Sequence, residues 1–207
     1  MAFSRSLALW ITVLGGCAVP SASIHEGPLS VESSAGQHVT LDELRAHREA
    51  TVLVFWSATC PCVRRYQGRV DALLDTYPQE RVRILAVSSN AGESFADVLE
   101  VAKERGVRVP LYRDEGGRLA RALGARSTPT VVVLDSAGDI RFLGWIDNER
   151  LPGEPGREPW LDNAIQGVLA GNTAIKARSP VYGCPITRSL LGTEPAAAPR
   201  SCCTAKP

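Results

Sequence analysis

Two cysteines separated by a single proline, Cys60 and Cys62, are the residues best suited to do chemistry in this chain. They follow an apolar run at residues 51–56 that predicts a buried strand, and they precede residues 62–77, whose spacing predicts an amphipathic helix. A helix N-terminus carries partial positive charge and unpaired N–H groups, and both favour a thiolate over a thiol. The pattern therefore predicts a reactive sulfur at an exposed corner between strand and helix.

The segments that would position this corner alternate between strand and helix patterns. A short strand and a helical turn are predicted within residues 39–45. Further strands are predicted at residues 82–88, 109–112, 130–135 and 140–146, and helices at 94–105, 117–123 and 160–170. This order predicts the α/β class, with a central mixed sheet flanked by helices.

Length and composition fit one soluble domain with extensions at both ends. The chain has 207 residues, 44% of them hydrophobic, and a formal net charge of +1, so its charge gives no reason to expect a nucleic-acid partner. We place the domain at residues 29–175. Residues 176–207 are rich in Pro and Ala and predict a mostly poorly ordered tail, which holds Cys184, Cys202 and Cys203.

The N-terminus is predicted to be a targeting segment. Residues 7–14 form an apolar run after Arg5, too short to span a bilayer comfortably. The run ends in Leu14-Gly15-Gly16-Cys17, which resembles a bacterial lipobox, so residues 1–17 would be a lipoprotein signal and Cys17 the lipidated residue. Residues 18–28 would be a flexible tether. Ordinary secretory cleavage near residues 21–23 is the alternative, and both versions predict an exported, periplasmic protein in which disulfides persist.

Three segments together resemble a known family. They are residues 54–62, the strand at 82–88, and Ser127-Thr128-Pro129-Thr130 at the opening of another strand. They are similar to the thioredoxin fold, and more narrowly to exported redoxins of the TlpA and peroxiredoxin-like (AhpC/TSA) type. The resemblance covers about residues 29–170. It implies that Pro129 follows a cis peptide bond and faces the active cysteine. The neighbours of the site would be Trp56, Thr59, Pro61, Tyr66 and Thr128.

This chain departs from the family patterns at four positions. Only Pro61 separates the two cysteines, whereas thioredoxins have two residues there, and Thr59 replaces the usual tryptophan. Val54 stands where a buried acid would accept a proton, and Ser57 stands where a peroxiredoxin has threonine. The family name alone therefore does not assign reductase or peroxidase activity.

The roles of the cysteines follow from their places in the chain. Cys60 is the predicted nucleophile and Cys62 the nearest resolving thiol. Cys184 is a second candidate for the resolving thiol, through resemblance to one branch of redoxins. In that branch Cys-Pro is followed a few residues later by a tyrosine or a similar residue, as Tyr66 follows here. That branch often carries a further cysteine after the last helix in a Gly-Cys context, as Cys184 stands here. Cys202 and Cys203 are too close in sequence to pair easily with one another.

Two classes of function remain open at this point. The first is a thiol–disulfide oxidoreductase without a cofactor, acting on protein thiols and disulfides with an upstream thiol reductant and a lipid anchor to the membrane. Its variant is a thiol peroxidase, in which a small peroxide oxidises Cys60. The second class is a soft-metal module like the copper-handling Sco proteins, since thiolates favour Cu(I). Sco proteins need a histidine downstream of the cysteines, and the histidines here are all upstream, at His25, His38 and His47.

Overall fold

The computed structural model describes residues 27–149, 157–172, 177–180 and 183–187. The predicted signal segment with Cys17, the tether up to residue 26, and Cys202 and Cys203 lie outside the described residues. Within the described ranges, no helix has the length and apolar character needed to cross a membrane.

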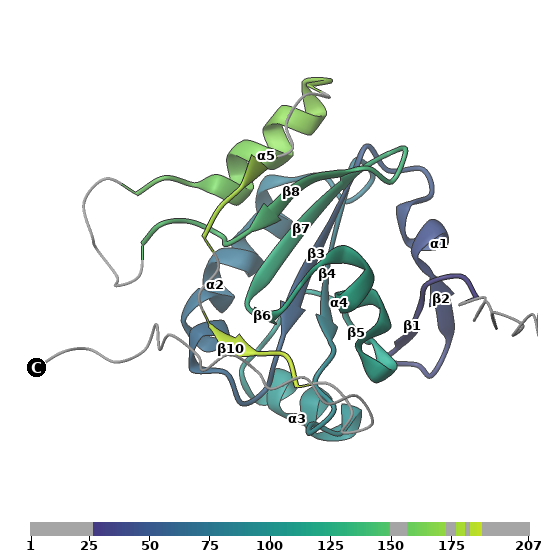
Figure 1. The fold of residues 1–207 in the computed structure, drawn as a ribbon. Coiled ribbons are helices and arrows are strands. Elements are labelled where there is room, and N and C mark those ends of the chain that lie inside the picture. The colour runs from purple at the N-terminus through teal and green to yellow at the C-terminus, as the bar shows by residue number, and fades with distance from the viewer. Residues whose placement is uncertain (1–26, 150–156, 173–176, 181–182, 188–207) are drawn as a thin grey trace, which may run out of the picture.

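A mixed sheet forms the middle layer of the domain (Figure 1). In the described part of the chain it has eight strands in the order β2-β1-β5-β4-β3-β7-β8-β9. The pairs β3–β4, β4–β5 and β8–β9 are parallel, and the other pairs are antiparallel. A separate pair, β6 with β10, is antiparallel. The strands are β1 Ser30–Ser33, β2 His38–Thr40, β3 Ala50–Trp56, β4 Val82–Ser88, β5 Leu111–Arg113, β6 Ser127–Thr128, β7 Thr130–Asp135, β8 Ile140–Gly144, β9 Ala177–Arg178 and β10 Cys184–Pro185.

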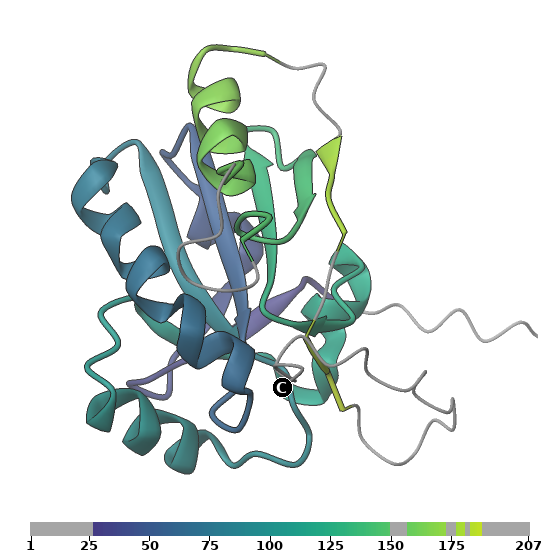
Figure 2. The same cartoon turned by 90° about the vertical axis from the view of Figure 1, so that its left-hand side faces the viewer.

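Helices cover both faces of the sheet, as Figure 2 shows for α2 and α4 on opposite sides. Side chains of β3 alternate between two cores: Val54 and Trp56 pack with α2, α3 and α5, and Phe55 packs with α1 and α4. This three-layer arrangement confirms the predicted α/β class. The helices are α1 Leu41–Arg45, α2 Pro61–Thr76, α3 Phe95–Glu104, the 3-10 turn η1 Glu115–Gly117, α4 Arg118–Leu123 and α5 Trp160–Leu169.

The predicted strands and helices that build the sheet layers are present, most within one or two residues of the expected bounds. Two described segments of the predicted tail form strands that the sequence did not indicate: β9 pairs with β8, and β10 pairs with β6. Two-residue strands carry no alternating pattern to detect. They form because backbone groups at an open strand edge accept another extended segment.

Two segments distant in sequence meet at one edge of the sheet. Strand β7 runs antiparallel to β3, with Phe55 opposite Thr130, so the start of β7 lies beside the end of β3. Pro129 lies between β6 and β7, and Cys60 follows β3. The topology therefore brings the Cys-Pro-Cys corner and Pro129 to the same edge.

A glycine inside α2 weakens the helix that carries the cysteines. Gly68 is exposed, and a Cβ added there would meet nothing within 4 Å. Glycine in a helix interior is less favourable than alanine, because it loses more backbone freedom on folding. We expect Gly68→Ala to raise the free energy of unfolding by roughly 0.5–1 kcal/mol, measured by urea denaturation. An unchanged or lower value would contradict this.

Candidate thiol site

Cys60 is the N-cap residue of α2, and Pro61 follows as the exposed first residue of the helix. The expected corner exists, but the expectation of an exposed sulfur is wrong, since Cys60 is only 1% exposed. Its thiol donates a hydrogen bond to the carbonyl oxygen of Thr128 at 3.2 Å. Neighbouring segments therefore enclose the sulfur at the edge where β3 ends.

The peptide bond between Thr128 and Pro129 is cis, as the family resemblance implied. Both residues are buried. Thr128 belongs to β6, and its carbonyl oxygen faces the Cys60 sulfur. Thr128, one of the neighbours that the family resemblance implied, thus contacts Cys60, and Pro129 follows Thr128 directly in the chain.

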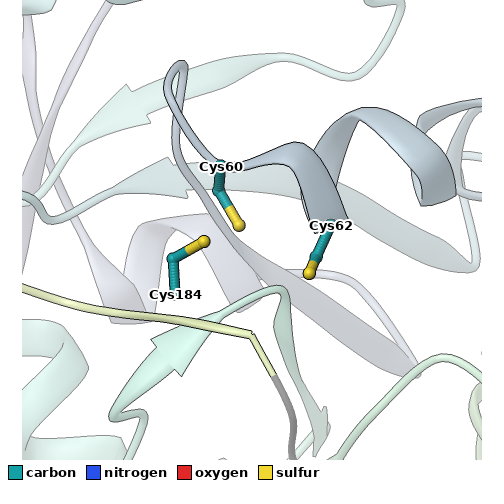
Figure 3. A group of neighbouring side chains, drawn as sticks. All are labelled: Cys60, Cys62 and Cys184. Atoms are coloured by element: carbon teal, nitrogen blue, oxygen red, sulfur yellow. The ribbon is translucent and has the colours of Figure 1, made fainter. Parts of the chain in front are cut away.

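Three sulfur atoms meet at this site (Figure 3): the Sγ atoms of Cys60, Cys62 and Cys184 lie within 4.8 Å of one another. Cys60 is a free thiol, whereas Cys62 is disulfide-bonded. The structure thus contains no bridge between Cys60 and Cys62 or between Cys60 and Cys184. It brings together the predicted nucleophile and both of the predicted resolving cysteines.

Cys184 reaches the site through backbone pairing. In the antiparallel pair of β6 and β10, Cys184 lies opposite Thr128 and Pro185 lies opposite Ser127. The hydroxyl of Thr128 also donates to the carbonyl oxygen of Cys184 at 3.5 Å. Because Thr128 contacts Cys60 as well, one residue links Cys60 and Cys184.

Glu93 holds the loop that leads into Cys60, and the sequence analysis missed it. Its carboxylate accepts hydrogen bonds from the hydroxyls of Ser57 at 2.6 Å and Thr59 at 2.7 Å, and from the backbone N–H groups of Ala58 and Thr59. Burial acts to raise the pKa of Glu93, but these hydrogen bonds together outweigh it and hold the pKa below its ordinary value of 4.5.

One signal in the sequence could have located Glu93. It follows β4, the parallel neighbour of β3, and the carboxyl ends of parallel strands lie at the same edge of a sheet. Arg105, just after α3, completes the support by donating to the carbonyl oxygen of Ala58 at 2.7 Å. The loop before Cys60 is therefore fixed from two sides by residues that flank α3.

Glu93 makes the free energy of unfolding depend on pH in the acid range. A carboxyl whose pKa is lower in the folded chain stabilises the fold above its unfolded pKa, and this stabilisation is lost as the pH falls through the folded value. We expect the free energy of unfolding to fall more steeply below pH 4.5 in the wild type than in Glu93→Gln. Urea denaturation across that pH range measures this. Glu100→Gln, on the exposed side of α3, is the control and should retain the wild-type slope.

Trp56 and Tyr66 pack beside the site. The Trp56 indole donates to the Gln67 side chain at 2.8 Å, and the Tyr66 ring lies 5.1 Å from that of Trp145. Burial, followed by the Asp147 carboxylate, raises the pKa of Tyr66 to about 12. Tyr66 is thus protonated near neutral pH. Its hydroxyl donates to the carbonyl oxygen of Glu149, so its observed contacts are those of a packing residue.

A buried ionic network joins α2 to the chain after β8. Arg69 contacts Asp147 and Glu149, each at 2.7 Å, and Arg157 contacts Asp147 at 3.0 Å. The Asp147 side chain is fully buried. The Arg69 guanidinium also lies over the Tyr66 ring, 4.8 Å from its centre. The sequence analysis did not identify this network, which anchors the helix that carries the cysteines.

The three cysteines are also the described residues best suited to bind a metal. Thiolates are soft ligands that favour Cu(I) and Zn²⁺. Cys60, Cys62 and Cys184 could supply three of them only if all three were reduced, and Cys62 is disulfide-bonded in the structure. Among the described residues, no histidine belongs to this group, and His47 precedes β3, so it lies at the opposite end of that strand from Cys60. This donor set gives the Sco-like interpretation no histidine ligand.

The arrangement defines a protein of the thioredoxin-like fold, with a buried cysteine at a helix N-terminus beside a cis-proline. Structural comparison agrees: a proposed thioredoxin from Neisseria meningitidis superimposes with a TM-score of 0.55 at 21% identity, over 70% of this chain and 89% of that one. An uncharacterized conserved protein from Geobacillus kaustophilus superimposes with a TM-score of 0.67 at 25% identity, over 82% of this chain and 90% of that one.

The chain belongs to the AhpC/TSA family, whose sequence model matches residues 20–143. It is similar to the thiol-disulfide oxidoreductase ResA of Halalkalibacterium halodurans, with 29% identity over 110 residues, which are 53% of this chain and 60% of that protein. Sporulation thiol-disulfide oxidoreductase A of Bacillus subtilis matches with 25% identity over 93 residues, 44% of this chain and 56% of that protein. The chain thus spans less than two thirds of the length of both relatives.

Proposed function

We propose that this protein is an exported thiol–disulfide oxidoreductase that exchanges disulfides with protein thiols through Cys60. The observation that carries the proposal is the placement of Cys60 at the N-cap of α2, beside cis-Pro129, with two further sulfurs within 4.8 Å. A helix N-terminus favours the thiolate, which is the attacking species in exchange. The two curated relatives carry this activity in their names, which supports the same chemistry here.

The reaction proceeds in two displacements. The Cys60 thiolate attacks one sulfur of a substrate disulfide, the S–S bond breaks, and the departing sulfur takes up a proton. A second thiol, Cys184 or Cys62 once its own disulfide has been reduced, then attacks Cys60 Sγ and releases the other substrate thiol. The substrate gains two electrons and the enzyme is left with a disulfide, which an upstream dithiol reductant restores. No cofactor takes part in either step.

A thiol peroxidase is the competing proposal, in which a peroxide oxidises Cys60 to a sulfenic acid. It is less favoured, because Ser57 replaces the threonine of the peroxiredoxin pattern. The Ser57 hydroxyl also donates its hydrogen bond to the Glu93 carboxylate at 2.6 Å. Both curated relatives are named for disulfide exchange rather than peroxide reduction.

The proposal includes a location outside the cytoplasm. The lipobox-like sequence before Cys17 supports a periplasmic protein held to the membrane by a lipid. A lipid at Cys17 would add a characteristic mass to the peptide that begins there. Mass spectrometry of the protein expressed in a bacterial host would detect that peptide, and a chain cleaved after residues 21–23 would contradict the anchor.

Two assays on the full chain separate the two enzymatic proposals. The first follows reduction of insulin disulfides with dithiothreitol as the reductant, and the second follows consumption of hydrogen peroxide. The proposal predicts that the protein accelerates insulin reduction beyond dithiothreitol alone and consumes peroxide slowly. Rapid peroxide consumption without faster insulin reduction would favour the peroxidase instead.

A further inference from the structure

The segment 183–187, which we call the strap, is fixed to the domain along β6. It contributes strand β10, and the backbone N–H of Ile186 donates to the carbonyl oxygen of Arg126 at 2.9 Å. Ile186 is 7% exposed and packs in the core that α1 and α4 cover. The strap is therefore held by both backbone pairing and a buried apolar side chain.

The end of the strap is fixed to the loop after β4. The backbone N–H of Thr187 donates to the side-chain oxygen of Asn90 at 2.9 Å, and the N–H of Ala91 donates to the carbonyl oxygen of Thr187 at 2.8 Å. This loop also carries Glu93, which supports the residues before Cys60. The strap thus bridges the two segments that flank the nucleophile.

The start of the strap requires a glycine. Gly183 has a φ of +139°, and a Cβ added there would lie 2.0 Å from the carbonyl oxygen of Thr128. No real Cβ approaches an oxygen that closely, so any larger residue would separate the strap from β6. The same Thr128 oxygen accepts the hydrogen bond from Cys60, so the close approach occurs directly at the nucleophile.

The strap places its own sulfur against the buried nucleophile. Figure 3 shows the sulfur of Cys184 pointing toward that of Cys60, and the two lie within 4.8 Å. A sulfur that reacts with Cys60 must come within about 2 Å of Cys60 Sγ in the disulfide that forms. Cys60 is 1% exposed, so a protein disulfide cannot reach its sulfur in this arrangement, with the strap docked beside it.

We propose that the strap is a built-in substrate for Cys60: it closes the site when docked, and Cys184 rather than Cys62 is the thiol that resolves the mixed disulfide. The inference rests on the proposed exchange activity and deepens it. Its substrates are extended polypeptide segments that carry a cysteine and take the place of the strap on β6.

The electrons balance over one cycle. The strap leaves β6, the Cys60 thiolate attacks the substrate disulfide, and one substrate thiol departs. The strap then returns, and the Cys184 thiolate attacks Cys60 Sγ, which releases the second substrate thiol. The protons of Cys60 and Cys184 end on the two substrate thiols, and the product is a Cys60–Cys184 disulfide. A dithiol reductant reopens that disulfide.

Gly183→Ala tests the strap without removing a cysteine. The fully reduced full-length chain is pulsed with N-ethylmaleimide, and modification of Cys60 is followed by peptide mass spectrometry. Labelling of a buried group follows the population of its open state, so we expect Cys60 to react at least about tenfold faster in Gly183→Ala than in the wild type. Ile186→Ser, which weakens the same docking, should act in the same direction. Gly68→Ala, a glycine change in α2, should leave the rate unchanged.

Disulfide mapping gives the second readout. After mild oxidation of the reduced chain with diamide, we expect Cys60 to be found mainly in a peptide linked to Cys184. Equal labelling rates in the wild type and Gly183→Ala, or a predominant Cys60–Cys62 bridge, would overturn the inference.

The insulin assay on the same proteins separates this inference from the proposed function. Insulin reduction by all the variants together with equal labelling rates would overturn the strap and leave the oxidoreductase proposal standing. Faster labelling in Gly183→Ala without insulin reduction by any protein would support the closed strap and contradict the exchange activity on which the inference rests.

Discussion

Replacing Cys60 by serine is expected to lower the rate of insulin disulfide reduction at least about a thousandfold, to that of dithiothreitol alone. A serine hydroxyl does not ionise near neutral pH and cannot form a disulfide, so no mixed intermediate is made. The serine keeps the local structure, because its hydroxyl can donate to the Thr128 carbonyl oxygen as the thiol does. The measurement is the initial rate at a fixed concentration of dithiothreitol.

Gly68→Ala is the matched control for this prediction, because it changes the same helix without touching a sulfur. It should retain the wild-type rate. Cys60→Ser must also keep a cooperative unfolding transition for the comparison to count. A folded Cys60→Ser protein with more than a tenth of the wild-type rate would show that another cysteine is the nucleophile.

Of the substitutions proposed here, Arg69→Met is expected to lower the free energy of unfolding most, by about 3 kcal/mol. Arg69 contacts Asp147 and Glu149, whose side chains are 0% and 8% exposed, so its removal takes one of the two guanidinium groups that the structure places beside these buried carboxylates, the other being that of Arg157. Removing one partner of a buried ion pair costs more than the pair itself contributes, because a charge remains buried without compensation. Urea denaturation at neutral pH measures the change.

Arg108→Met is the control for this effect. Arg108 pairs with Asp75 at 2.6 Å, but both side chains are more than half exposed, and exposed ion pairs contribute little. We expect a much smaller loss of stability than for Arg69→Met. Equal losses in the two variants would show that burial of the carboxylates is not the cause.

The central part of the fold could be predicted from sequence because its signals are local. The strands β3, β4 and β7 are continuous apolar runs of the kind that a sheet covered on both faces requires, and the helices show regular apolar spacing. The corner with Cys60 and the cis bond before Pro129 were also found, the second through the family resemblance.

The features that were missed depend on contacts between distant segments. Burial of Cys60 was not predicted because an N-cap residue is normally near the surface, and here a segment more than a hundred residues later packs against it. Strand β10 has two residues and no alternation, so only the edge of β6 defines it. Glu93 is a single acid before a helix, and its role depends on the parallel pairing of β3 with β4.

The most direct test of the account is to trap the mixed disulfide on Cys60. In the full-length chain with both Cys62→Ser and Cys184→Ser, neither of the two described sulfurs beside Cys60 can complete the second displacement, so the intermediate should accumulate when the reduced protein meets insulin. Peptide mass spectrometry is then predicted to find an insulin cysteine bound to Cys60. An insulin adduct on a different cysteine, or no adduct in a folded protein, would contradict the assignment of Cys60 as the nucleophile of disulfide exchange.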